Sequence, residues 1–305
     1  MPLLITRRGY TLIEILVALV LLGIVSAGVY KVLVNNQRIY TAQTQRIDLQ
    51  QNIRAAAAIL PAEFRQLDAA EGDITAMGPD SIRMRAIRQL AFLCAAPSLG
   101  GSVSQVDLTI RQTPIYGNRQ TFAAGDSLLV YWEGDPANRS DDTWLPALVQ
   151  QAPGTGTCSD GTPAIVLQKL QPTWLASTQF NIAGAITNGS PVFRFNSVLY
   201  RSYADAGGTW WLGVQNLSSG GSIQPLVGPL IGSNGVTFSY FDSAGVATTV
   251  PTQVAQIQIV LRARTALPVR DGTGPLAYKV DSAVTWVALR NNPRCGPGSL
   301  PPRAC

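Results

Sequence analysis

The apolar positions of this chain are concentrated in one uninterrupted run near the amino terminus. Residues 15–30 contain no charged side chain. Extended back to Tyr10, the run reaches the ~20 residues that a helix needs to cross the hydrocarbon core of a bilayer. Arg7 and Arg8 precede it. The pattern predicts a transmembrane helix whose amino-terminal end faces the cytoplasm, because basic residues flank the cytoplasmic end of such helices.

A cleavable secretory signal is the alternative interpretation of the same run. Such a signal carries a small-residue cleavage site after its apolar core, and none is apparent here. The single acid, Glu14, costs at most roughly 2.5–3.5 kcal/mol in a membrane helix, whereas Leu, Ile and Val each return about 0.3–0.6 kcal/mol. Insertion therefore stays favourable by a small margin, and we expect the helix to be retained.

Polar and apolar residues alternate with a helical period beyond the membrane run. The segment from Asn35 to Gln66 is rich in Gln, Ala and Arg. Apolar residues recur in it at spacings of three and four: Ile53, Ala57, Leu60, Phe64 and Leu67. This spacing predicts an amphipathic helix over residues 35–67, continuous with the membrane helix of residues 10–34. Pro61 should kink or close it. The whole helix would be roughly 85 Å long.

The remaining chain, residues 68–305, reads as one β-rich composite domain. Short β-like segments are separated by Gly, Pro, Asn and Ser. The candidates are Ser81–Ile87, Val106–Arg111, Ser127–Trp132, Ala164–Leu170, Val192–Tyr203, Thr209–Leu217, Val236–Phe241, Gln253–Arg264 and Lys279–Leu289. In Gln253–Arg264, apolar Ile257, Ile259 and Leu261 alternate with polar residues, so this strand should cover the helix.

Trp210 and Trp211 are adjacent in another of these segments. They should point to opposite faces of one strand, one into the core and the other toward a partner.

Composition and charge argue against an enzyme or a metal protein. The formal charge is +5, and without residues 1–9 it is 21 bases minus 18 acids, or +3, too little to argue for nucleic acid. The chain has no His, no G-x-S-x-G and no Walker-type nucleotide loop, so we expect no catalysis and no cofactor. The acids of EGDPANRSDDTW are Glu133, Asp135, Asp141 and Asp142. They could hold calcium, but they lack the EF-hand spacing and fit a solvated loop better.

Four cysteines remain to be explained: Cys94, Cys158, Cys295 and Cys305. An even number fits disulfides in a domain outside the cytoplasm, and four cysteines allow three connectivities. Cys295 and Cys305 bracket a proline-stiffened loop, GPGSLPPRA, which favours a local bridge. A bridge from Cys94 to Cys158 then follows by elimination. Zinc is the rival reading, but no CxxC pair and no His is present.

The stretch RRGYTLIE and the apolar run behind it resemble the type IV prepilin signal, which pilins share with the pseudopilins of type II secretion. The resemblance implies that prepilin peptidase cuts after Gly9, removes residues 1–9 as a leader and methylates the new amino terminus. Tyr10 takes the place of the usual Phe. Glu14 falls on the acidic position of the family, where it would pair with the amine of Tyr10 on a neighbouring subunit. The alternative is an acid that snorkels at a helix end.

A second resemblance is spread over the chain. In order, the segments NIRAAAAILPAEFRQL, VLYRSY, PLVGPLIGSNGVTFSYFDSAG, QVAQIQIVLRART and VTWVALRN are similar to PilW-type minor pilins and the related J-type pseudopilins. The fold implied is α+β, a long membrane-spanning helix packed on an elaborated antiparallel sheet. Lys31 stands where major pilins commonly have a helix-breaking proline, which argues against a major pilin. The long insertion between about Ser98 and Asn188 favours the pilus branch.

The function implied by both resemblances is that of a structural subunit. We expect a minor pilin that takes part in type IV pilus assembly, with other minor pilins, the major pilin and the assembly platform as partners. It would be a single-pass protein of the bacterial inner membrane with a periplasmic domain, and would enter the pilus on assembly. Two alternatives stay open: a J-type pseudopilin of type II secretion, and a receptor, adhesin or DNA-uptake subunit at a pilus tip.

Overall fold

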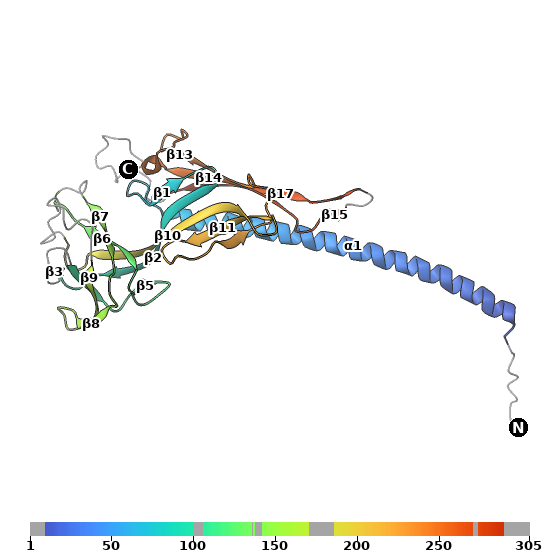
Figure 1. Ribbon diagram of the computed structural model, residues 1–305, viewed down its shortest axis with the longest axis horizontal. Helices are drawn as coiled ribbons and strands as arrows, with labels where there is room; N and C mark the ends of the chain where they lie inside the picture. The colour runs from blue at the N-terminus through green and yellow to red at the C-terminus, as the bar shows by residue number, and fades with distance from the viewer. Residues whose placement is uncertain are drawn as a thin grey trace, which may run out of the picture.

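One long helix and a β-rich body make up the computed structural model of this chain. The structure describes residues 10–99, 106–135, 137, 142–170, 186–270 and 274–289. Helix α1 (Leu12–Arg65) projects far from the body at its amino-terminal end, while its carboxyl-terminal half lies against the sheets (Figure 1). The α+β fold expected from the sequence is confirmed.

The buried stripe of α1 follows the predicted helical spacing with one difference. Its buried residues are Leu49, Ile53, Ala56, Leu60 and Phe64. Ala56 is fully buried, and Ala57, which the pattern placed on this face, is only half-buried. Pro61, expected to kink or close the helix, lies inside it, and α1 ends one turn later.

The strands are short, apart from β2 and β10, which run the length of the body. They are β1 (Ile74–Met77), β2 (Ser81–Phe92), β3 (Ser98–Leu99), β4 (Val106–Arg111), β5 (Tyr116–Gly117), β6 (Ser127–Trp132), β7 (Thr143–Leu148), β8 (Gly154–Thr157), β9 (Pro163–Leu170), β10 (Pro191–Ala204), β11 (Trp210–Asn216), β12 (Gln224–Val227), β13 (Val236–Phe241), β14 (Gln256–Arg264), β15 (Val269–Arg270), β16 (Leu276–Ala277) and β17 (Val280–Ala288). A 3-10 turn, η1 (Pro251–Gln253), precedes β14. Every predicted segment coincides largely with one of these strands.

Two sheets enclose the buried stripe of α1. The larger has the path β1-β2-β10-β11-β12, and the smaller has the order β13-β14-β17. Phe64 joins both, because its ring lies 5.6 Å from the ring of Tyr200 on β10 and 5.9 Å from that of Phe238 on β13. The alternating residues Ile257 and Ile259 of β14 are buried in this core, as the pattern predicts. The helix is thus held by apolar contacts from two sides.

A second core lies away from α1 and accounts for the long insertion. It contains Leu108, Leu128 and Leu167, contributed by β4, β6 and β9. Strands β2 and β10 run through both cores: Val198 of β10 is buried in the first, and Val192 of the same strand in the second. Figure 1 shows the strands β3 to β9 gathered at the end of the body remote from the membrane helix. The insertion therefore forms a second lobe built on two shared strands.

Charged pairs cross the junction between the two lobes. Arg194 is buried, and its Nε donates to Asp126 Oδ1 at 2.8 Å. Asp126 also accepts hydrogen bonds from Arg119 and from the amide of Ala123. Close by, Arg88 of β2 makes a two-pronged ion pair with Glu63 of α1, both bonds being 3.0 Å long. Removing one member of the Asp126 pair would leave a buried charge, which is strongly destabilising.

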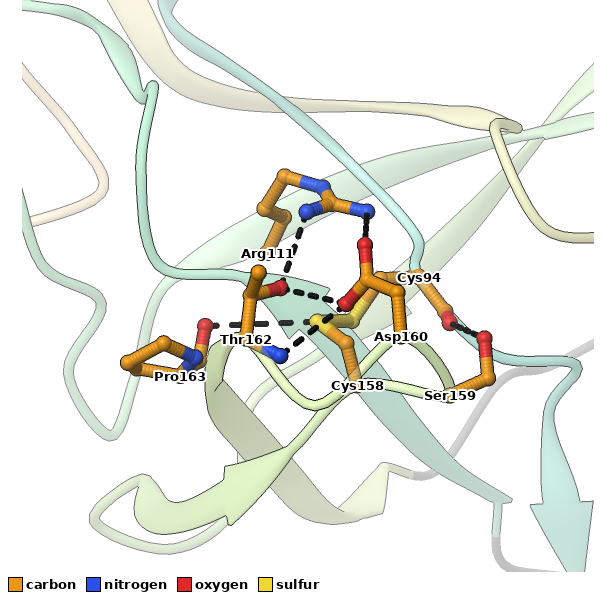
Figure 2. Close-up of a disulfide and its surroundings, with 7 residues drawn as sticks. All are labelled: Cys94, Arg111, Cys158, Ser159, Asp160, Thr162 and Pro163. Atoms are coloured by element: carbon orange, nitrogen blue, oxygen red, sulfur yellow. Dashed lines mark hydrogen bonds and ion pairs between the residues drawn. A yellow bond between two sulfur atoms is a disulfide. The ribbon is translucent and has the colours of Figure 1, made fainter.

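A disulfide between Cys94 and Cys158 fastens the second lobe to the end of β2. Figure 2 shows the Cys158 loop folded around Asp160, whose carboxylate accepts from Arg111 at 2.6 Å and from the Thr162 hydroxyl at 2.6 Å. These hydrogen bonds, led by the one from Thr162, hold the pKa of Asp160 well below its usual range. The disulfide expected of a domain outside the cytoplasm is therefore present.

The turn after α1 carries a buried acid with an unusual pKa. Asp73 is 4% exposed, and its Oδ2 accepts the amide of Asp68 at 2.9 Å. Burial raises the pKa of Asp73 to about 6, although the Asp68 hydrogen bond and the charge of Arg85 act in the opposite direction. Because the unfolded chain has the ordinary value of 3.8, the folded state holds this proton more tightly.

Asp73 should make the stability of the protein fall as the pH rises. Its favourable contribution is complete below about pH 4 and is lost as the pH rises through about 6. Asp73→Asn keeps a hydrogen-bond acceptor and cannot ionise. We expect the variant to match wild type near pH 4 and to exceed it by about 2–3 kcal/mol near pH 7. Urea unfolding of the detergent-solubilised protein across this range measures the difference. If the free energies of unfolding of the two proteins change with pH in parallel, the prediction is wrong.

Candidate assembly site at the start of the long helix

The amino-terminal half of α1 is an apolar rod without protein contacts. Its apolar side chains are at least half exposed from Leu12 to Leu33, Leu16 at 57% and Leu22 at 61% being typical. Among the described residues α1 alone is long and apolar enough to cross a membrane, and none of its most apolar stretch is buried by the rest of the chain. Such a surface needs lipid or other apolar helices around it.

The first turn of α1 is closed by a reciprocal capping box. Thr11 is the N-cap: its Oγ1 accepts the amide of Glu14 at 3.4 Å, and Glu14 Oε2 accepts the amide of Thr11 at 3.3 Å. Two backbone donors that have no partner within the helix are thereby satisfied.

The capping box is the one feature of this site that the sequence analysis missed. Its signal is present in the chain as Thr11 followed three residues later by Glu14, the S/T-x-x-E pattern. Glu14 consequently has a partner inside its own subunit, besides the neighbouring amine that the resemblance implies. Tyr10, which would carry that amine, is 83% exposed and precedes the N-cap. Both groups are therefore accessible to another subunit.

The other predicted site residues lie far from the start of α1 or outside the described residues. Gly9, Cys295 and Cys305 belong to the second group, so cleavage and a Cys295–Cys305 bridge stay predictions. In the acidic loop, Asp135 accepts the amide of Ala137 at 3.0 Å. No group of three or more potential metal ligands occurs within the described part of the chain.

The paired tryptophans divide as the strand period predicts. Trp210 packs against the core around α1. Trp211 lies on the other face of β11, where its indole Nε1 donates to Asp205 Oδ2 at 2.8 Å. The indole of Trp211 also lies so close to Gly228 that a Cβ there would come within 2.6 Å of the ring. Trp211 is therefore fixed by its own chain, and a role toward a partner stays a prediction.

Comparison with known proteins gives one finding, and it falls on the helix start. Residues 6–30 match the family model described as the prokaryotic N-terminal methylation motif. No curated protein and no solved structure matches the chain. The match marks this segment as that of a type IV pilin-like prepilin, a class that includes the pseudopilins.

The class carries three consequences for this chain. Prepilin peptidase processes proteins with this motif, and they are structural subunits in a pilus or pseudopilus. The exposed apolar helix is consistent with a membrane-anchored protein. Because the motif covers residues 6–30 only, it says nothing of the body beyond α1.

Processing should remove the first nine residues. We expect mass spectrometry of the protein extracted from membranes to show a chain that begins at N-methylated Tyr10. Gly9→Val should leave the precursor uncut, because it places a branched side chain where the peptidase requires glycine. The matched control is Gly23→Val, which makes the same substitution inside α1 and should be cut normally. A mature chain that begins beyond residue 30 would contradict the pilin-like assignment.

Proposed function

We propose that this chain is a minor pilin of the PilW type, a subunit that takes part in starting type IV pilus assembly. The observation that carries the proposal is the bare apolar half of α1, which ends in an accessible Tyr10 and Glu14. Such a helix can leave the lipid of the membrane and pack among the similar helices of other subunits in a filament. The helix runs through Lys31 without a break, unlike the proline-interrupted helices of major pilins.

The second lobe supports the pilus branch over the J-type pseudopilin. The lobe has its own apolar core and its own disulfide between Cys94 and Cys158. It shares the strands β2 and β10 with the rest of the body, with β5 pairing to β2 and β6 pairing to β10. A compact pseudopilin needs no such elaboration, whereas a subunit near a filament end has room for it. The J-type pseudopilin of a type II secretion system remains the alternative.

Glu14 would act in assembly by exchanging partners. In the lone subunit its carboxylate accepts from the Thr11 amide at the solvated helix end. In a filament the same carboxylate would meet the methylated amine of Tyr10 from a neighbour, in apolar surroundings where opposite charges attract strongly. Both ionised groups would be neutralised by this contact, which fixes the register of one helix against the next.

Glu14→Gln separates the two roles of this side chain. Glutamine also completes a capping box, so the variant should insert, be cut after Gly9 and accumulate normally. It carries no charge for the neighbouring amine. It should therefore fail to co-purify with the other minor pilins and fail to restore pili to a deletion strain, as should Glu14→Ala.

Thr11→Ala is the matched control for Glu14→Gln. It removes the N-cap at a cost of about 0.5–2 kcal/mol and keeps the carboxylate. We expect it to assemble. If Glu14→Gln restores pili as well as wild type, the acid only caps its own helix. If the deletion strain keeps its pili but loses protein secretion, the pseudopilin alternative is correct.

One surface favours a tip receptor as a second candidate function. Strands β2, β10 and β11 contain no acidic residue. On the face of β2 and β10 turned away from α1, Arg83 pairs in register with Leu199, and Arg201 with Ser81. Both arginines are exposed. Arg85, two residues from Arg83, lies over the ring of Phe195 at 5.6 Å. Exposed arginines beside an aromatic ring suit an anionic polymer such as single-stranded DNA.

Binding of single-stranded DNA tests the receptor role. If it holds, the purified protein should bind an oligonucleotide with an affinity that falls steeply with salt. Arg83→Gln with Arg201→Gln should weaken binding and reduce the salt slope by about 1.4, since each phosphate contact on a single strand contributes about 0.7. Arg262→Gln, an exposed arginine on the smaller sheet, serves as the control. Absence of salt-sensitive binding would contradict the receptor role.

A further inference from the structure

A hairpin of the body reaches along α1 toward the membrane-spanning part of the helix. Strands β15 and β16 pair with each other, Val269 opposite Ala277 and Arg270 opposite Leu276. Figure 1 shows this region as the part of the body nearest the exposed helix. Between the hairpin and α1 lies an open groove of about 480 Å³, lined on the helix side by residues from Val34 to Ala42.

The hairpin is held at a fixed level on the helix. The amide of Leu267 donates to Gln45 Oε1 at 3.0 Å. Helix residues rise 1.5 Å each, so the ~30 Å of hydrocarbon take up about 20 residues. Counted from Ile15, the first residue after Glu14, these end at about Val34. The groove begins at this residue, which places Arg270 and Leu276, both in its lining, at the level of the lipid headgroups, whereas Leu267, held at Gln45, lies roughly 16 Å farther from the hydrocarbon.

The residues exposed at this level have the composition of a membrane interface. Leu276 is 60% exposed. Basic residues share the region, with Lys31 and Arg38 on α1 and Arg270 on the hairpin. An exposed leucine among basic side chains is typical of segments that lie in the headgroup layer.

We propose that the hairpin is a membrane-docking surface that binds anionic phospholipid while the subunit is still anchored in the bilayer. The surface consists of Lys31, Arg38, Arg270 and Leu276. Leu276 enters the boundary between headgroups and acyl chains, and the basic side chains contact lipid phosphates. The inference rests on α1 spanning the membrane and does not depend on which filament the subunit joins.

Docking would hold the body upright over its anchor. A single helix allows the body to swing about the point where it leaves the bilayer, whereas a second contact restrains that motion. The charged contact suits a reversible attachment, because each basic residue near an anionic surface contributes only about fivefold to binding. The body can therefore leave the membrane when α1 is extracted.

Photo-crosslinking in a bilayer tests the proposal. A benzophenone amino acid replaces Leu276 in the full-length protein, one copy per nanodisc, with anionic phosphatidylglycerol in the lipid. The control places the same group at Val246, which is 61% exposed. Val246 follows β13, whose end Phe241 pairs with Gln256, the end of β14 remote from the hairpin. We expect adducts of the residue-276 peptide with phospholipid and none at residue 246.

The lipid charge provides the second arm of the experiment. Replacing phosphatidylglycerol by phosphatidylcholine, or introducing Arg270→Glu, should lower the adduct yield at residue 276 several-fold, because each removes an attraction worth about fivefold. Adduct yields that are equal at residues 276 and 246 would overturn the proposal. So would a yield at residue 276 that is insensitive to both changes, or adducts with the protein's own chain in place of lipid. The Glu14 variants do not touch this surface, so the two proposals fail independently.

Discussion

The structure depends on the burial of one side of the carboxyl-terminal half of α1 between two sheets. Phe64 shows how: its ring contacts Tyr200 of the larger sheet and Phe238 of the smaller one, so each sheet completes the surroundings of the same side chain. Neither sheet covers this stripe alone. The helix packs against both of them, and its amino-terminal half is left bare because none of the described strands reaches that far.

Much of the fold could be predicted because its long elements carry strong periodic signals. The stripe of α1 and the alternation in β14 each bury the residues that the pattern selects, apart from the exchange of Ala57 for Ala56. The short strands were missed for a physical reason. Strand β8 is Gly-Thr-Gly-Thr and β5 is Tyr-Gly, so neither has apolar alternation, and each is a strand only because a longer neighbour pairs with it.

The division into two lobes was also beyond the sequence pattern. Strands β2 and β10 read as ordinary segments, and their length alone does not show that they cross from one core to another. The residues that mark the junction, Asp126 and Arg194, lie 68 positions apart and form a pair only in the folded chain. At the candidate assembly site the sequence does contain the signal. Thr11 and Glu14 form a local capping-box pattern, but the sequence analysis considered Glu14 only as a partner for the amine of a neighbouring subunit.

The hairpin and the helix start are linked mechanically through α1. Gln45 holds the hairpin at Leu267, and the stripe from Leu49 to Phe64 holds both sheets, so the body and the helix move as one unit. Raising α1 by one turn, about 5.4 Å, raises the hairpin by the same distance and takes Leu276 out of the headgroup layer. The same movement brings Glu14 deeper into apolar surroundings, where its own cap satisfies it less well than a second charge would. If the subunit is extracted from the bilayer during assembly, as the proposed function requires, this movement weakens the lipid contacts of the hairpin and at the same time favours the pairing of Glu14 with a neighbouring amine.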